Sequence, residues 1–168
     1  MKKDFSKIKL FAMDVDGTLT DGKIYIGNDG EVMKAFNAKD GLGIKLLIKK
    51  GIIPIIITGR RSKIVTRRCE EIGITVLYQG VRDKAAILKD VMEKYDCTPE
   101  QTVYIGDDMN DLPAMQTAGI TFAPADCAAA LIPYVNFVLT QKSGDAPVRE
   151  AIDLILENRL TLSDYENI

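Results

Sequence analysis

Two aspartates, two residues apart, directly follow an apolar segment near the start of the chain. Segment 8–13 is predicted to be a buried strand, and Asp14-Val15-Asp16-Gly17-Thr18 comes directly after it. Because residues two apart point the same way on an extended chain, both carboxylates would face the crevice at the carboxyl end of a parallel strand. Like charges this close repel each other unless a cation lies between them. The alternative for this string alone is a surface turn without a chemical role.

Three later strand ends add further reactive groups. Segment 52–57 ends at Thr58-Gly59-Arg60, whose hydroxyl and backbone amides suit a phosphate oxygen, and Lys84 follows segment 75–78. Segment 102–105 ends in a second acidic run, Gly106-Asp107-Asp108-Met109-Asn110-Asp111. Each group alone could be structural, and an exposed lysine would be the default for Lys84. Together they predict that acid, hydroxyl, amine and acid meet in one crevice.

The composition excludes several kinds of site. The 168 residues suit one domain, and we interpret 1–168 as a single domain. The absence of histidine removes a Ser-His-Asp hydrolase, a Cys-His protease and a histidine zinc site. Cys69, Cys97 and Cys127 form no CxxC pair, which fits a reducing cytoplasm better than a disulfide framework. A net charge of −2 predicts no nucleic-acid partner, and no apolar stretch predicts a membrane span.

Short apolar segments alternate with amphipathic ones along the chain. Helices are expected over 41–50, 62–73, 83–95 and 148–156, with Ser62 as an N-cap and Gly73 as a stop. Weaker strands are expected at 120–122 and 137–139. Repeated strand–helix–strand units predict an α/β fold, a Rossmann-like doubly wound parallel sheet with helices on both faces.

One segment breaks this alternation. Extended runs at 23–26 and 32–36 flank Gly27-Asn28-Asp29-Gly30, which predicts a β-hairpin flap directly after the first strand. An isolated hairpin is only marginally stable in water. We therefore expect this hairpin to pack on something else, such as another subunit.

The order of these motifs resembles the haloacid dehalogenase superfamily of phosphohydrolases. The matching residues are DxDGT at 14–18, Thr58, Lys84 and GDDxND at 106–111. The resemblance implies that Asp14 is the nucleophile, which becomes an aspartyl phosphate. It implies that Asp16 is the general acid–base, and without histidine a carboxylate must move the proton. It also implies that Thr18, Thr58 and Lys84 hold the phosphoryl oxygens.

The same resemblance implies a magnesium ion. Its ligands would be the Asp14 carboxylate, the Asp16 backbone carbonyl and Asp107, with Asp108 or Asp111 in support. Magnesium prefers oxygen ligands, so this set suits it better than zinc. A phosphate monoester dianion repels a carboxylate nucleophile, and Mg²⁺ together with Lys84 would offset that charge.

The finer pattern is similar to the family of 3-deoxy-D-manno-octulosonate 8-phosphate phosphatases, which serve lipopolysaccharide sugar biosynthesis. The similar stretches are 21–25, 36–41, 57–61, 64–65, 68–69, 77–80 and 148–150. The gaps between the motifs leave no room for a cap domain, and the resemblance implies a capless homotetramer whose hairpins cluster and whose active sites are shared. For the substrate carboxylate the candidates are Arg60 and Arg68, because arginine binds a carboxylate bidentately. The alternative for Arg68 is a solvated helix face.

Two departures leave the substrate open. The glycine-rich run of the family is reduced to 143–147, and the tail 161–168 shows no close match. A nine-carbon sugar acid 9-phosphate is therefore the alternative substrate.

A response-regulator receiver, which signals without turnover, is the alternative from another class. Receivers place adjacent acids after the first strand and the phosphorylated aspartate after the third. Here a spaced pair follows the first strand and the double aspartate follows the fourth. A binding module without activity is the other alternative, and phosphate release would distinguish both from an enzyme.

Overall fold

The computed structural model describes residues 4–166, which contain a six-stranded parallel sheet in the order β5-β4-β1-β6-β7-β8. The strands are β1 (Leu10–Met13), β4 (Ile53–Thr58), β5 (Val76–Gln79), β6 (Thr102–Ile105), β7 (Ile120–Ala123) and β8 (Phe137–Val138). The chain first builds outward from β1 through β4 and β5, and then from β6 to β8 on the other side. This confirms the predicted doubly wound sheet and puts its switch point at the end of β1.

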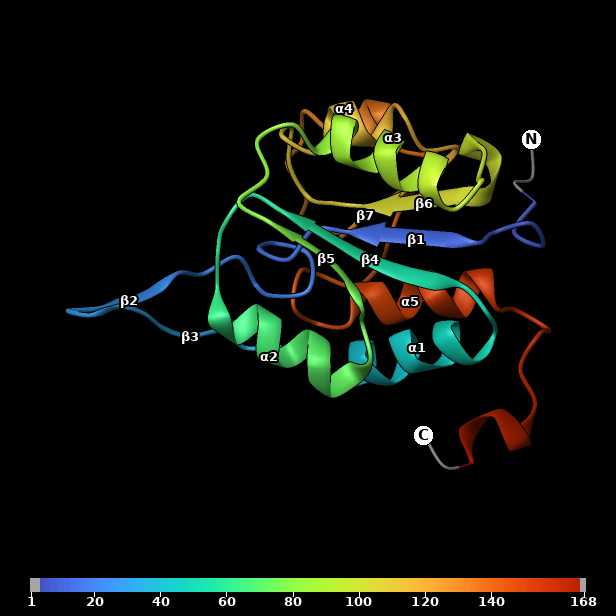
Figure 1. Cartoon of the computed structure of the whole chain (residues 1–168), viewed down its shortest axis with the longest axis horizontal. Coiled ribbons are helices and arrows are strands. Elements are labelled where there is room, and N and C mark those ends of the chain that lie inside the picture. Colours follow the sequence, from blue (N-terminus) through green and yellow to red (C-terminus); the bar gives the residue numbers. More distant parts are fainter. Residues whose placement is uncertain (1–3, 167–168) are drawn as a thin grey trace.

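Helices cover both faces of the sheet (Figure 1). One face carries α1 (Ala38–Lys49), α2 (Lys63–Ile72) and α5 (Pro147–Ile155), and the other carries α3 (Lys84–Lys94) and α4 (Leu112–Met115). Alternate residues of β1 pack on opposite faces of the sheet. Phe11 and Met13 belong to one apolar cluster, and Leu10 and Ala12 belong to the other. Burial on both faces explains why the strands are almost continuously apolar.

Capping residues fix where the helices begin and end. The Ser62 hydroxyl accepts from the Val65 amide at 3.2 Å, and Gly73 ends α2 in the left-handed conformation at φ 83°. Asp83 caps α3, so that Lys84 is its first residue. Helix α1 begins at Ala38 rather than the predicted 41, because the Asn37 side chain accepts from the Lys39 amide and caps it earlier.

The predicted hairpin is present but shorter than expected. Its strands β2 (Tyr25–Gly27) and β3 (Gly30–Met33) pair antiparallel and project away from the body of the molecule (Figure 1). The apolar side chains of Ile26 and Val32 are 70% and 61% exposed. Nothing in the described part of this chain covers them.

Short 3₁₀ turns complete the described chain: η1 (Pro99–Gln101), η2 (Ile132–Tyr134) and η3 (Leu162–Tyr165). The last of these is fixed to the end of α1, where Lys49 Nζ donates to backbone carbonyls of residues 163, 164 and 166. Within residues 4–166, no helix is both long and apolar enough to span a bilayer.

Candidate active site

Asp14 follows the end of β1, and its side chain is buried. Its Oδ1 accepts from the Val15 amide at 2.8 Å, and its Oδ2 lies 2.7 Å from Lys84 Nζ. Burial raises the pKa of Asp14 to about 6, helped by the negative charge of Asp111 and opposed by Lys84. The carboxylate is thus held at both oxygens by donors from its own strand end and from the start of α3.

Lys84 bridges two carboxylates. Its Nζ also lies 2.7 Å from Asp111 Oδ1, and the side chains of Lys84 and Asp111 are 3% and 0% exposed. Burial works against the ammonium, but Asp14 and Asp111 outweigh it and raise the pKa of Lys84. Asp111 accepts two further hydrogen bonds, from the Tyr104 hydroxyl at 2.8 Å and from the Asp107 amide at 3.1 Å. Lys84 is therefore a charged, fixed donor at the centre of the site.

Three carboxylates converge as a metal centre requires. Ligand atoms of Asp14, Asp107 and Asp111 all lie within 4.8 Å of one another. Burial raises the pKa of Asp107 to about 7, and the charges of Asp111 and Asp14 add to that effect. With all three carboxylates ionised and Lys84 protonated, the cluster has a charge of −2, which one divalent cation would neutralise. A hard cation with oxygen ligands, such as Mg²⁺, fits this donor set.

Glycine is needed beside this cluster. Gly17 has φ 85°, and a Cβ there would come within 2.1 Å of Asp107 Oδ2. The DxDGT turn and the second acidic run therefore touch at this point, and Gly17 makes the approach possible. Of the two acids predicted to support the metal, Asp111 joins the cluster. Asp108 instead accepts from the Met109 amide at 2.6 Å.

The Asp16 carboxylate lies beside two cations. Lys34 Nζ, from the base of the hairpin, pairs with its Oδ1, and Arg60 Nε lies 3.9 Å from its Oδ2. The predicted candidates Asp16 and Arg60 are thus brought together. Lys34 was not predicted, because no sequence pattern connects a lysine in the hairpin with an aspartate eighteen residues earlier.

The predicted phosphate-binding residues lie around the same strand ends. Thr18 and Thr58 are buried, at 0% and 2% exposure, and Gly59 follows β4 at the surface. The Thr18 hydroxyl has no hydrogen-bond partner within the described residues. An unpaired buried hydroxyl is costly, which suits a group that serves a ligand.

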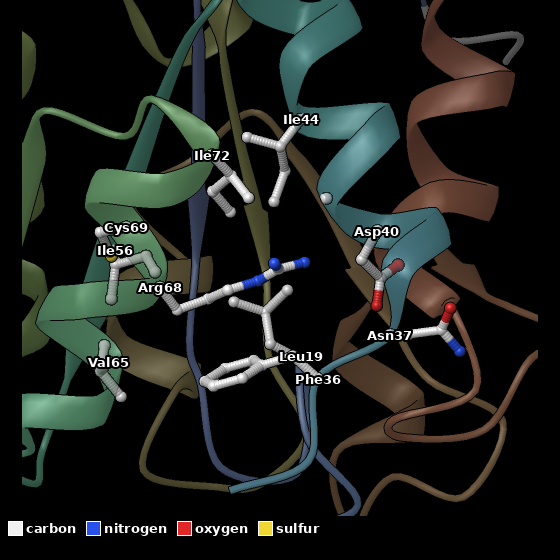
Figure 2. A pocket seen from close by; sticks show the side chains of 11 residues that line it. Leu19, Phe36, Asn37, Asp40, Ile44, Ile56, Val65, Arg68, Cys69 and Ile72 are labelled. Atoms are coloured by element: carbon white, nitrogen blue, oxygen red, sulfur yellow. The ribbon is translucent and has the colours of Figure 1, made fainter. Parts of the chain in front are cut away.

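Arg68 lies elsewhere. Figure 2 shows its side chain pointing from α2 toward Asp40 of α1, across a small, mainly apolar pocket. Its Nη1 lies 3.0 Å from Glu71 Oε2, and its guanidinium stacks 5.8 Å from the centre of the Phe36 ring. The side chain is only 20% exposed, so it does not lie on a freely solvated helix face. Of the two candidates for the substrate carboxylate, Arg60 is the one that lies beside Asp16.

The chain matches known proteins in sequence and in structure. Residues 42–119 match the family model of haloacid dehalogenase-like hydrolases. The chain is 46% identical over 151 residues to 3-deoxy-D-manno-octulosonate 8-phosphate phosphatase KdsC of Yersinia pestis, covering 90% of this chain and 81% of that protein. It belongs to this family of haloacid dehalogenase-like phosphatases. The resemblance drawn from the motifs is confirmed, and the receiver alternative is set aside.

Solved structures of this phosphatase family share the fold. The cobalt-bound enzyme of Haemophilus influenzae superimposes with a TM-score of 0.91 at 38% identity, over 96% of this chain and 95% of that one. The enzyme of Moraxella catarrhalis, in complex with magnesium, phosphate and KDO, has a TM-score of 0.88 at 40% identity, over 91% and 88% of the two chains. The protein is accordingly an α/β phosphatase built on this sheet.

Proposed function

We propose that the protein is a Mg²⁺-dependent phosphomonoester hydrolase that acts on 3-deoxy-D-manno-octulosonate 8-phosphate, in the cytoplasmic synthesis of a lipopolysaccharide sugar. One observation carries the chemistry: Lys84 joins Asp14 to Asp111, 2.7 Å from each, beside Asp107. The family relatives named for this substrate support its identity. A nine-carbon sugar acid 9-phosphate remains the alternative substrate.

Asp14 is proposed as the nucleophile. Its Oδ1 accepts from the Val15 amide and its Oδ2 from Lys84, so the carboxylate is oriented before substrate arrives. In the first step an Asp14 oxygen bonds to phosphorus while the bond from phosphorus to the ester oxygen breaks. Asp16 gives a proton to the departing alcohol. In the second step Asp16 takes a proton from water, which attacks phosphorus and releases inorganic phosphate and free Asp14.

The phosphate carries negative charge toward a site already rich in carboxylates. Lys84 would offset part of this charge, and Thr18, Thr58 and the backbone at Gly59 are proposed to bind the phosphoryl oxygens; the burial of Thr18 and Thr58 at the strand ends supports this role. Asp14, the Asp16 backbone carbonyl and Asp107 would hold Mg²⁺, which supplies the remaining neutralisation when bound. Asp111 supports this set through the Asp107 amide and Lys84.

The substrate carboxylate is assigned to Arg60. Its side chain is 51% exposed and its Nε lies 3.9 Å from Asp16 Oδ2, so a half-exposed guanidinium beside the proposed general acid could bind a second anion. Arg60→Ala should therefore lower kcat/KM for a sugar acid phosphate far more than for a neutral sugar phosphate. Equal losses on the two substrates would remove this role. The same panel, extended to eight- and nine-carbon acids, distinguishes the two proposed substrates.

Assembly is proposed as a homotetramer of single-domain subunits, 1–168, with shared active sites. The exposed apolar hairpin supports this, because Ile26 and Val32 need a cover that the described chain does not supply. The gaps between the motifs leave no room for a cap domain among residues 4–166, so a neighbouring subunit is the proposed lid.

The decisive test of the proposed function is phosphate release by Asp14→Asn. This nearly isosteric change should keep the fold and lower turnover by several orders of magnitude. Asp153→Asn is the matched control, since Asp153 lies on α5 and pairs with Arg149 at 2.7 Å, away from the cluster. Wild-type turnover in Asp14→Asn, or full activity after removal of Mg²⁺ with EDTA, would overturn the mechanism.

A further inference from the structure

Lys34 lies at the base of an exposed hairpin, but its side chain is buried. Its side chain is only 2% exposed, whereas the preceding Val32 and Met33 are 61% and 48% exposed. Burying an ammonium is costly unless it is paired. Lys34 Nζ is paired twice, with Asp16 Oδ1 and with Glu31 Oε1 at 3.2 Å. The base of the hairpin therefore holds a positive charge beside the carboxylate of Asp16.

Glu31 fixes Lys34 to the rest of the site. Its second oxygen accepts from the Ser62 hydroxyl, and Ser62 also caps α2 just beyond Arg60. Burial opposes the charge on Glu31, but the hydrogen bonds from Ser62 and Lys34 outweigh it and lower the pKa of Glu31. Lys34 thus lies between two carboxylates, one of which is anchored to the start of α2. This arrangement holds its ammonium in place without help from a ligand.

The pairing leaves the two Asp16 oxygens unequal. Oδ1 is paired with Lys34, while the one ion-pair partner of Oδ2 among residues 4–166 is the half-exposed Arg60, at 3.9 Å. Without Lys34 the carboxylate could rotate about its side-chain bonds. With it, one defined oxygen remains to exchange a proton with a bound molecule. A group that transfers a proton depends strongly on such orientation.

We propose that Lys34 is a positioning residue that orients the Asp16 carboxylate toward the leaving-group oxygen and so couples the hairpin to the chemical step. The proposal rests on the proposed role of Asp16 as general acid. A purely structural anchor would need only Glu31, which already offers a partner for the buried ammonium. A structural role alone therefore does not explain why Lys34 also pairs with Asp16.

The test compares two leaving groups. The specificity constant kcat/KM reports phosphoryl transfer to Asp14, the step in which the leaving oxygen is protonated. A sugar alkoxide needs that proton, whereas p-nitrophenolate leaves readily without it. Lys34→Met should therefore lower kcat/KM on the order of 10- to 100-fold more for a sugar phosphate than for p-nitrophenyl phosphate. Lys34→Arg, which restores a cation, should recover much of the difference.

Two controls separate positioning from structure. Lys23→Met removes the other hairpin lysine, which is 71% exposed and pairs with Asp21, and it should change neither substrate. In an Asp16→Asn background, Lys34→Met should have no further effect on the ratio between the substrates, because the group it orients is gone. Sedimentation of each variant checks that assembly is unchanged.

The outcomes distinguish this inference from the proposed function. Equal losses on both substrates in Lys34→Met, or a further shift of the ratio in the Asp16→Asn background, would overturn the positioning role. If Asp16→Asn shows the leaving-group effect and Lys34→Met does not, the inference fails while the proposed function stands. If Asp14→Asn and Asp16→Asn both turn over normally, the proposed function fails.

Discussion

Replacing Lys84 with methionine tests how the charges of the active site are balanced. Lys84 Nζ is 2.7 Å from both Asp14 and Asp111, and the three side chains are 3%, 6% and 0% exposed. Methionine keeps much of the side-chain volume but removes the ammonium. With its carboxylates ionised, the cluster of Asp14, Asp107 and Asp111 then changes from −2 to −3, and two carboxylates lose their shared partner. Breaking a buried ion pair from one side costs about 3–5 kcal/mol.

That cost is large beside a typical free energy of unfolding of about 5–15 kcal/mol. Lys84→Met should therefore unfold at a much lower urea concentration than the wild type, and Mg²⁺ should stabilise it because the cation replaces part of the lost positive charge. The double variant Lys84→Met with Asp111→Asn removes one of the unpaired charges. It should recover about half of the lost stability, since the asparagine oxygen still accepts from Tyr104 or from the Asp107 amide.

The double variant should recover stability but not activity. Both the single and the double variant should lose about 10²–10³-fold or more in phosphate release, because no donor then faces the phosphoryl group from α3. The measurements are urea unfolding with and without Mg²⁺, and phosphate release at saturating Mg²⁺. Lys89→Met is the matched control, since Lys89 is an exposed lysine of the same helix.

Two results would refute this reasoning. An unchanged urea midpoint in Lys84→Met would mean that the buried charges do not depend on one another. A double variant that recovers activity along with stability would mean that Lys84 acts only as a counter-charge. If Lys84→Met does not fold, Asp111→Asn alone still decides, because it should leave Lys84 paired with Asp14 and cost much less stability than the lysine variant.

Further predictions concern the proposed metal ligand Asp107, the buried carboxyl of Asp40 in the first turn of α1, and the hairpin. Asp107→Ala should raise the Mg²⁺ concentration for half-maximal phosphate release, because it removes one carboxylate of the converging set. Burial raises the pKa of Asp40 to about 7 against the opposing charges of Arg68 and Arg149, so the folded protein keeps a proton there that the unfolded chain loses above about pH 4. The free energy of unfolding of the wild type, measured in urea, should therefore fall as pH rises from about 4 to 7. Asp40→Asn cannot ionise at this position, so its free energy of unfolding should fall less over the same range. If the two plots of unfolding free energy against pH are parallel, this role of Asp40 is excluded. Ile26→Asp should sediment as a smaller species that hydrolyses p-nitrophenyl phosphate better than the sugar acid phosphate, whereas a fully active wild-type monomer would exclude shared sites.

Most of the sheet was predictable because each strand is a short apolar run that is buried on both faces. Segment 102–105 matches β6, and the Ser62 cap and Gly73 stop define α2 as expected. The reactive residues could be predicted to lie together for a related reason: they follow the carboxyl ends of parallel strands, which meet at one edge of the sheet. Asp14, Lys84 and Asp107 accordingly lie together although they are far apart in the sequence.

Side-chain direction was the part that the sequence left open. Arg68 follows the arginine-rich stretch after β4, yet the turn of α2 points it toward Asp40 and Phe36 rather than the crevice (Figure 2). Lys34 lies in a hairpin whose pattern is apolar, and its burial comes from the tertiary pairing with Asp16 and Glu31. Both outcomes depend on how one element packs on another, which no local spacing encodes.

The spacing of the second acidic run has a physical cause in the way Asp111 packs against the end of β6. A Cβ at Gly106 would lie 2.4 Å from Asp111 Cγ, so the glycine makes room for the Asp111 side chain to fold back over the end of β6. Once there, Asp111 accepts from the Asp107 amide and the Tyr104 hydroxyl, and it pairs with Lys84. Asp111, five residues after Gly106, thus holds the loop in the conformation that brings Asp107 close to Asp14. The Asp108 side chain instead accepts a hydrogen bond from the adjacent amide, that of Met109. The run GDDxND is therefore one folded unit, in which the last acid holds the first in place.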